Sequence, residues 1–530
     1  MIMKSTRRTA MLGAALIAGS LAFGAAAQAE TTLRVVKAGN LAILDPIFTT
    51  AYVVRDHGYL IYDTLFSVDE NNAVKPQMVD KWTVSADKLT FTFTLRDGLE
   101  WHDGKPVTSE DCIASLKRWG KRDTMAIKLM DFVKEFKAVD AKTFQLILKE
   151  PYGLVIDSLG KPSSNVPFMM PKRIADTDAF KQISEYVGSG PFIYQVAQSK
   201  PGEKHVYLKN PKYKPRKEPP SGLAGGKVAK VDRVELIEMP DVQVQVNALL
   251  ADEIDIIEAP PHDLLSVLKA DKNVALEDWN PLGHVFVIRF NHKVKPFDNP
   301  KVRLAALYAI NQEDYLKATV GDAKYYKVCG AAFICGTPNA TDKGADFLVK
   351  SNFEKSKALL KEAGYDGTPI VLMQSTTLPV LTNTAPVTKS LLEKGGFKVD
   401  MQSMDWGTLT GRRAKKDPAD KGGWNVFHTY SVSADALNPI SNAYFAANGD
   451  KAWFGWPDDP EMEKLRDAYA RETDPVKQKA LAEKVQLRAL ETAQFGWIGQ
   501  WYGPGARRAN VKGWLKAPVP VFWNIEKTGK

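Results

Sequence analysis

Cysteine and histidine are scarce in this sequence, which has 3 Cys and 7 His among 530 residues. The histidines are scattered and form neither a His-x-His nor a His-Glu-x-x-His pattern, so the sequence gives little support for a metal site. A Gly-x-Ser-x-Gly motif is also missing, and Gly225-Gly226-Lys227 lacks the flanking residues of a phosphate-binding loop. We therefore predict no catalytic residue, no metal and no cofactor.

Two further features are missing. No run of basic residues is interleaved with aromatic side chains on a predicted helix, so nucleic acid is not expected as a partner. No segment beyond the N-terminus is apolar for long enough to cross a bilayer. The composition, with 44% hydrophobic residues and 12 Trp, instead predicts a large folded core divided into more than one domain.

Residues 1–29 have the organisation of an export signal. Lys4, Arg7 and Arg8 form a basic start, a stretch rich in Ala and Gly follows, and Ala27-Gln28-Ala29 offers small residues where a signal peptidase cuts. A membrane anchor is the alternative, and the polar residues directly after Ala29 argue against it. We predict cleavage after Ala29 and a periplasmic mature protein, exported by the general or the twin-arginine route.

Cys329 and Cys335 bracket a short segment that looks like a loop. In an oxidising compartment a local disulfide between them is the expected state, and two free buried thiols are the alternative. Cys112 falls in a predicted helix and is interpreted as a small core residue rather than a nucleophile.

The clearest structural pattern lies just past the middle of the chain. Val285–Asn291 is an apolar, β-branched and aromatic run that predicts a buried strand. After a turn, Asn299 is expected to cap a helix that begins at Pro300, with apolar residues at helical spacing up to Ile310. Strands alternate with helices in both halves of the chain, which predicts an α/β architecture.

Aromatic residues crowd the last quarter of the chain, and several lie at predicted strand ends or in loops. Core packing explains part of this enrichment, and the functional interpretation is an aromatic pocket that includes Trp406, Tyr430 and Trp453. Asp435 follows a predicted strand, and the pair Arg412-Arg413 follows Trp406 by about two helical turns. Asp435 and Arg412 are predicted to hold opposite ends of a zwitterion, with solvated surface charges as the alternative.

Several segments, in the same order along nearly the whole chain after residue 29, resemble those of one protein family. The most specific is Leu95–Pro106, and the others include Leu44-Asp-Pro46, Gly188-Ser-Gly-Pro-Phe192, Asn210-Pro-Lys-Tyr213 and Pro296–Arg303. Through these residues the chain resembles the family 5 extracellular solute-binding proteins of ABC importers, the dipeptide-, oligopeptide- and nickel-binding group.

This resemblance implies an α/β fold of two lobes that close over a ligand, with an extra subdomain in lobe I. Carried over to this chain, lobe I would comprise residues 30–283 with the subdomain at about 76–187, lobe II residues 284–500, and a tail of 501–530 that returns to lobe I. Members present the closed, ligand-bound form to a membrane ABC permease, and ligand stabilises the hinge state in which both lobes contact it. We expect a monomer.

By position, the resemblance places the ligand between two residues of lobe I and four of lobe II: Asn40 and Leu41, then Trp406, His428, Tyr430 and Asp435. Peptide binders of the family hold the free amino group of the ligand with an Asp. Ser431 stands at that position here, and Asp435 is expected to substitute for it.

This departure leaves several binding roles open. The ligand is expected to be a peptide or peptide-like solute, another small cationic or zwitterionic solute, or a nickel chelate with His428 nearby. Alternatives of other classes are a secreted hydrolase and a structural or chaperone-like envelope protein. A hydrolase needs a nucleophile–base cluster or a carboxylate pair in a pocket, which the sequence does not show.

Overall fold

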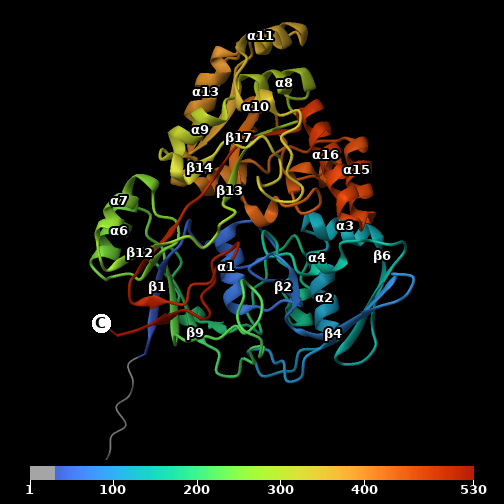
Figure 1. Ribbon diagram of the computed structural model, residues 1–530, viewed down its shortest axis with the longest axis vertical. Coiled ribbons are helices and arrows are strands. Elements are labelled where there is room, and N and C mark those ends of the chain that lie inside the picture. Colours follow the sequence, from blue (N-terminus) through green and yellow to red (C-terminus); the bar gives the residue numbers. More distant parts are fainter. Residues whose placement is uncertain (1–29, 530) are drawn as a thin grey trace, which may run out of the picture. The chain divides into compact units, whose positions relative to one another are not determined.

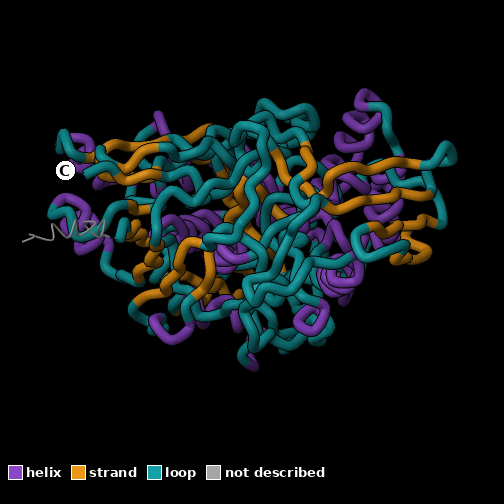
Figure 2. The backbone as a smooth tube through the Cα atoms, turned by 90° about the horizontal axis from the view of Figure 1, so that it is seen from below, coloured by secondary structure: helices purple, strands orange, loops and turns teal. Residues whose placement is uncertain are grey.

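The computed structural model describes residues 30–529, so the predicted export signal at 1–29 lies outside the described residues. The described part of the chain from Thr31 onward contains two large β-sheets, one sheet of four strands and two strand pairs. Figure 2 shows helices and strands mixed throughout, which is the α/β organisation expected from the sequence. We call the parts of the molecule built around the two large sheets the first lobe and the second lobe.

The first sheet has seven strands in the order β12-β19-β11-β1-β10-β9-β8. At its centre β1 runs parallel to both β10 and β11, and the remaining neighbours are antiparallel. The strands are β1 (Thr32–Val36), β8 (Phe192–Tyr194), β9 (Lys204–Lys209), β10 (Arg233–Ile237), β11 (Ile256–Ile257), β12 (Val274–Glu277) and β19 (Gly505–Arg508).

The second sheet has six strands in the order β14-β18-β13-β17-β15-β16. β13 pairs antiparallel with β17 on one side and β18 on the other, and all of its residues are buried. In Figure 1 the helices α8, α9, α11 and α13 lie around this sheet. The strands are β13 (His284–Phe290), β14 (Tyr326–Lys327), β15 (Ile370–Ser375), β16 (Val399–Met404), β17 (Val426–Val432) and β18 (Phe495–Trp501).

The predicted strand–turn–helix unit past the middle of the chain is confirmed. β13 is followed by α8 (Pro300–Ala309), and the Asn299 side chain accepts a hydrogen bond from the Lys301 N–H at 2.9 Å. Pro300 is the first helical residue, where its missing N–H removes no bond. The other helices of this lobe are α9 (Gln312–Thr319), α10 (Asp346–Val349), α11 (Phe353–Glu362), α12 (Pro379–Thr382), α13 (Thr384–Lys394), α14 (Trp406–Arg412), α15 (Pro460–Arg471) and α16 (Pro475–Glu491).

A four-stranded antiparallel sheet, in the order β4-β5-β7-β6, lies within the segment predicted as a subdomain. Its strands are β4 (Val79–Val84), β5 (Thr90–Leu95), β6 (Val133–Ala138) and β7 (Thr143–Leu148). Two helices belong to it, α2 (Ser109–Trp119) and α3 (Thr124–Phe132), and Asp123 caps α3 by accepting bonds from Met125 and Ala126. The subdomain limits of 76 and 187 stay a prediction.

The chain passes from one large sheet to the other at two places. It leaves β12 and enters β13 through Gly283, and it leaves β18 at Trp501 and enters β19 at Gly505. The two crossings touch, because a Cβ on Gly283 would lie 2.3 Å from the carbonyl oxygen of Trp501. The segment after residue 501 therefore contributes a strand to the first sheet.

Other elements of the first lobe include α1, which begins close to the end of β1. The helices are α1 (Tyr52–Ile61), α4 (Val155–Leu159), α5 (Lys172–Ala175), α6 (Val242–Leu250) and α7 (Leu265–Ala270), and short strand pairs are formed by β2 (Phe66–Val68) with β3 (Val74–Pro76) and β20 (Val511–Lys512) with β21 (Glu526–Lys527). A disulfide joins Cys329 to Cys335, and Cys112 is a buried free cysteine. Within residues 30–529 no helix has the length and hydropathy needed to traverse a bilayer.

Candidate ligand-binding site

A cavity of about 210 Å³ is lined by residues of both lobes. The first lobe contributes three stretches near residues 38–54, 122–124 and 161–165, and the second lobe contributes the start and end of α14, the end of β17 and the loop that follows it. Most of these stretches are loops or helix ends at the edges of the sheets, where side chains are free to face a ligand.

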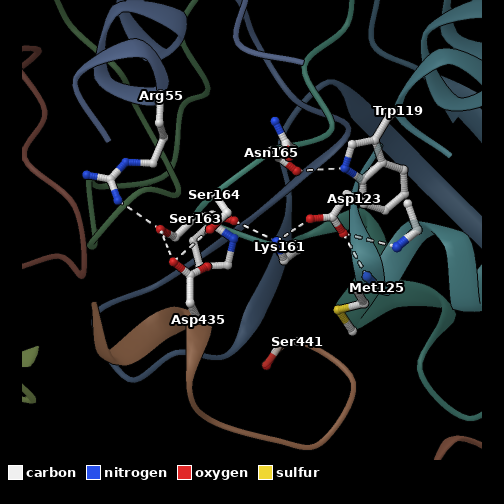
Figure 3. Close-up of polar contacts among 12 residues, drawn as sticks. Arg55, Trp119, Asp123, Met125, Lys161, Ser163, Ser164, Asn165, Asp435 and Ser441 are labelled. Atoms are coloured by element: carbon white, nitrogen blue, oxygen red, sulfur yellow. Dashed lines mark hydrogen bonds and ion pairs between the residues drawn. The ribbon is translucent and has the colours of Figure 1, made fainter. Parts of the chain in front are cut away.

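Asp435 is the acidic residue that both lobes share. It lies just after β17 of the second lobe and is 5% exposed. Its Oδ2 atom accepts three hydrogen bonds from hydroxyl groups of the first lobe. Tyr52 donates one at 3.0 Å. Ser163 at 3.0 Å and Ser164 at 2.9 Å donate the other two (Figure 3). Among the described residues its Oδ1 atom has no partner. One oxygen therefore fixes the lobes together and the other is left for a ligand.

Two charge pairs of the first lobe support these serines. Arg55 donates to the hydroxyl of Ser163 at 2.8 Å and is itself paired with Asp56 at 2.7 Å. Lys161 pairs with Asp123 at 2.5 Å and donates to the carbonyl of Ser163 at 2.8 Å (Figure 3). Burial raises the pKa of Asp123, while Lys161 opposes that rise. Ser163 is thus held from both sides.

Arg413 is the cationic counterpart, and aromatic rings surround it. Its guanidinium carbon lies 4.7 Å from the ring centre of Phe454, 5.2 Å from Trp453, 5.6 Å from Trp406 and 6.0 Å from Phe427. The residue is 7% exposed, and its Nε has no hydrogen-bond partner among residues 30–529. Burial lowers its pKa to about 10, so it stays charged at neutral pH. A buried guanidinium without an acid is a ready site for a carboxylate.

A second buried arginine holds the aromatic wall from behind. Arg289 of β13 donates to the carbonyl oxygens of Phe454 at 2.6 Å and Tyr444 at 3.1 Å, and no carboxylate in the described part of the chain pairs with it. Burial lowers its pKa to about 9. Tyr444 lies between the charges: burial and Asp435 raise its pKa, the arginines oppose them, and the result is about 12. Its phenol accepts a bond from Ser431 at 3.0 Å.

The structure brings five of the eight predicted ligand-binding residues to the cavity wall. These are Asn40, Trp406, Tyr430, Asp435 and Trp453. Tyr430 packs against Tyr52 of the first lobe with ring centres 5.6 Å apart, so it closes the wall where the lobes meet. Ser431 also lines the cavity, at the position where the resemblance would place an acid.

Of the predicted pair Arg412-Arg413, it is Arg413 that lines the cavity, and Arg412 does not. Successive helical residues point about 100° apart, and at the end of α14 this difference directs the two arginine side chains to different surroundings. The Arg412 guanidinium instead donates to the carbonyls of Gly422 at 3.2 Å and Gly423 at 2.7 Å, and to Gln402 at 2.6 Å.

Leu41 and His428 also lie off the wall. The side chain of Leu41 is 2% exposed and packs in the core, while its neighbour Asn40 faces the cavity. His428 lies deeper in β17 than Tyr430, and its Nε2 contacts Thr388 Oγ1 of α13 at 2.7 Å. Burial lowers its pKa to about 3. No group of three or more metal-ligating side chains occurs in the described part of the chain.

Sequence reasoning missed the residues of the first lobe that contact Asp435. Tyr52, Ser163 and Ser164 carry no motif, and they meet Asp435 only after the chain has folded across about 270 to 380 positions. The sequence did point toward Arg413, because the pair Arg412-Arg413 follows the predicted helix start at Trp406 by about two helical turns. Helical phase, counted from Trp406, would have been the way to choose between the two arginines.

Comparison with known families identifies the protein family of this chain. Residues 73–453 match the model for bacterial extracellular solute-binding proteins, family 5 Middle. The chain belongs to this family. Family 5 consists of solute-binding proteins, so its members bind their ligand and do not transform it. The family resemblance inferred from Leu95–Pro106 and the other segments is thereby confirmed.

Individual relatives agree with this assignment. The chain is 38% identical over 519 residues, 97% of each chain, to the probable peptide ABC transporter periplasmic-binding protein y4tO of Sinorhizobium fredii. Two solved structures have the same fold: AgaA of A. tumefaciens R10 in complex with agropinic acid (TM-score 0.79, 24% identity) and DppA of Helicobacter pylori in complex with the peptide STSA (TM-score 0.79, 21% identity). Each comparison covers 94% of this chain and 99% of the other. The predicted two-lobed periplasmic-binding-protein fold is confirmed.

Proposed function

We propose that this protein is the periplasmic substrate-binding component of an ABC importer and that it captures a small peptide or peptide-like amino compound. The family match and the name of the Sinorhizobium relative support the importer role. The ligand class rests on one observation of the cavity: among the described residues, Oδ1 of Asp435 and Nε of Arg413 have no hydrogen-bond partner, and both side chains line the same cavity.

In this proposal the ammonium group of the ligand binds Oδ1 of Asp435, and a ligand carboxylate binds the guanidinium of Arg413. Both bonds are charge-assisted and are made away from bulk water, where such bonds are strongest. The aromatic side chains of Trp406, Trp453 and Tyr430 pack against the middle of the ligand. Ligand pockets usually measure about 300 to 1,000 Å³, so a cavity of about 210 Å³ favours a small solute over a long peptide.

Asp435 also gives a physical reason for lobe closure. Oδ2 of Asp435 accepts the hydrogen bonds from Tyr52, Ser163 and Ser164, and Oδ1 of the same carboxylate is assigned to the ligand. A ligand that orders this carboxylate therefore favours the state in which the lobes meet around it. That closed state is the one proposed to dock onto the membrane permease.

Isothermal titration of the mature protein with L-alanyl-L-alanine tests the proposal. We expect binding by the wild type, together with a rise in melting temperature from mass action. Asp435→Asn and Arg413→Gln are each expected to weaken binding by at least about tenfold, because each leaves one buried ligand charge unpaired. Arg412→Gln is the matched control, since its guanidinium lies off the wall, and its affinity should stay within about twofold of wild type.

The proposal would be abandoned if a panel of dipeptides and free amino acid derivatives neither bound nor raised the melting temperature. It would also be abandoned if Arg412→Gln weakened binding as much as Arg413→Gln, because the assignment of the carboxylate site would then be wrong.

Several finer points belong to the same proposal. We propose cleavage after Ala29, lobe limits at 283/284 and 500/501, and a monomeric mature protein. N-terminal sequencing of the periplasmic form checks the cleavage site, limited proteolysis checks the lobe limits, and light scattering at several concentrations checks the monomer.

A further inference from the structure

The wall of the cavity carries more cations than carboxylates. Apart from tyrosines, five ionisable side chains lie on it: Arg122, Asp123, Lys161, Arg413 and Asp435. Lys161 and Asp123 form a buried ion pair at 2.5 Å and cancel each other. The proposed function uses Asp435 for an ammonium and Arg413 for a carboxylate. One cation, Arg122, is left over.

Arg122 has no acidic partner within the described residues. Its guanidinium lies 4.8 Å from the ring centre of Phe180 and 5.5 Å from that of Phe48, and it donates to the carbonyl of Phe48 at 2.5 Å. The side chain is half-buried, and burial lowers its pKa. A flat guanidinium held by two rings keeps a fixed orientation, which favours binding of a planar carboxylate.

The position of Arg122 decides which end of the ligand it faces. It directly precedes Asp123, which pairs with Lys161, and Lys161 donates to the carbonyl of Ser163. The hydroxyl of Ser163 bonds to Asp435 (Figure 3). Arg122 is therefore on the first-lobe part of the cavity wall, which also holds the Ser164 partner of Asp435, whereas Arg413 lies in the aromatic part of the second lobe.

The surroundings of the cavity add to its positive potential. Arg289 lies behind the wall formed by Tyr444 and Trp453 and is fully buried, and within residues 30–529 its hydrogen bonds go to carbonyl oxygens alone. A cation buried without a counter-ion is unfavourable, and the field of several such groups attracts an anion into the cavity. A neutral zwitterion would leave this excess uncompensated.

We infer that the ligand carries a net charge of −1, with one ammonium group at Asp435, one carboxylate at Arg413 and a second carboxylate at Arg122. For a dipeptide, this places the acidic side chain on the residue that bears the free amino group. The inference rests on the proposed function, since it uses the same ammonium and carboxylate sites. It adds the charge of the ligand and the place of its second acid.

Three dipeptides test this inference by titration calorimetry: L-aspartyl-L-alanine, its uncharged analogue L-asparaginyl-L-alanine, and L-alanyl-L-aspartate. We expect aspartyl-alanine to bind at least about tenfold tighter than each of the other two, as for hydrogen bonds to charged groups. Arg122→Gln should reduce the preference for aspartyl- over asparaginyl-alanine to about twofold or less, and Arg122→Lys should keep part of it.

Raising the salt concentration distinguishes a direct contact between Arg122 and the ligand from long-range attraction by the positive charges around the cavity. The preference at Arg122 should persist in 0.5 M NaCl, because a contact that excludes water is screened less than exposed charges. The inference is overturned if asparaginyl-alanine binds as tightly as aspartyl-alanine, or if Arg122→Gln keeps the full preference, and in either case the proposed function stands. If none of the three dipeptides binds, the inference is overturned, and the proposed function is then decided by the panel of dipeptides and amino acid derivatives.

Discussion

The hydroxyl of Tyr52 donates a hydrogen bond to Oδ2 of Asp435 at 3.0 Å, joining residues 383 positions apart and from different lobes. The same hydroxyl accepts a bond from the backbone N–H of Val432 at 2.9 Å. Burial and the charge of Asp435 raise the pKa of Tyr52 well above its ordinary value, so the phenol keeps its proton and remains a donor. Tyr52 thereby ties α1 of the first lobe to the end of β17 in the second lobe.

Replacing Tyr52 by Phe removes this tie without opening a hole. We expect the Tyr52→Phe variant to bind a ligand of the wild type about three- to tenfold more weakly, since one hydrogen bond to a charged group is lost. Titration calorimetry measures the change. Tyr59→Phe is the control, because Tyr59 lies on the same helix and donates to the carbonyl of Pro162 inside the first lobe. Its melting temperature should fall while its affinity stays unchanged.

The free energy of unfolding should fall on mild acidification because the fold lowers the pKa of all seven histidines. Burial lowers the pKa of every histidine, to about 3 for His57, His284 and His428 and to about 4 for His102. Between these values and about 6.5, the unfolded chain binds protons that the fold does not. The free energy of unfolding should therefore decrease as the pH drops from 6.5 to 5.

Urea unfolding at a series of pH values measures this slope. In His428→Gln, the slope should become shallower by up to about 1.4 kcal/mol per pH unit, the value of one proton. A stability that does not change between pH 6.5 and 5 would contradict the lowered pKa values.

Gly283 is required where the chain crosses between the two large sheets. Its φ is +65°, and an added Cβ would lie 2.3 Å from the carbonyl oxygen of Trp501 on the neighbouring crossing. We expect Gly283→Ala to lower the free energy of unfolding by more than about 2 kcal/mol, the sum of backbone strain and a backbone clash. Denaturant unfolding measures the loss.

A matched variant separates the two causes. Gly202 has a φ of +83° and no atom within 4 Å of an added Cβ. Gly202→Ala therefore carries the strain without the clash, and we expect a loss of only about 1 kcal/mol. Equal losses at both positions would show that the contact between the crossings contributes nothing.

The disulfide should stabilise the fold by a modest amount. Cys329 and Cys335 close a loop with a sequence separation of 6, for which the chain-entropy estimate is about 2 kcal/mol. Dithiothreitol should lower the melting temperature of the wild type and leave that of the double variant Cys329→Ser/Cys335→Ser unchanged. An equal response of both proteins to the reductant would argue against a stabilising bond.

Much of the local structure could be read from the sequence because its causes are local. The apolar run of β13, the Asn299 cap and Pro300 each act within a few residues, and all three took their predicted form. The aromatic residues and Asp435 pointed to the correct part of the second lobe for a similar reason, since strand ends and loops leave side chains free to meet a ligand.

The sequence by itself determined the alternating strands and helices, the caps, and the family to which the chain belongs. Only the tertiary structure decided which polar side chains meet. It placed Arg413 rather than Arg412 on the cavity wall, and it made Tyr52, Ser163 and Ser164 the hydrogen-bond partners of Asp435. The reason is physical. A cap or an apolar stripe is set by neighbours along the chain, whereas a binding cavity is set by helix phase and by the docking of two lobes. A shift of one residue in either would point a different side chain into the space.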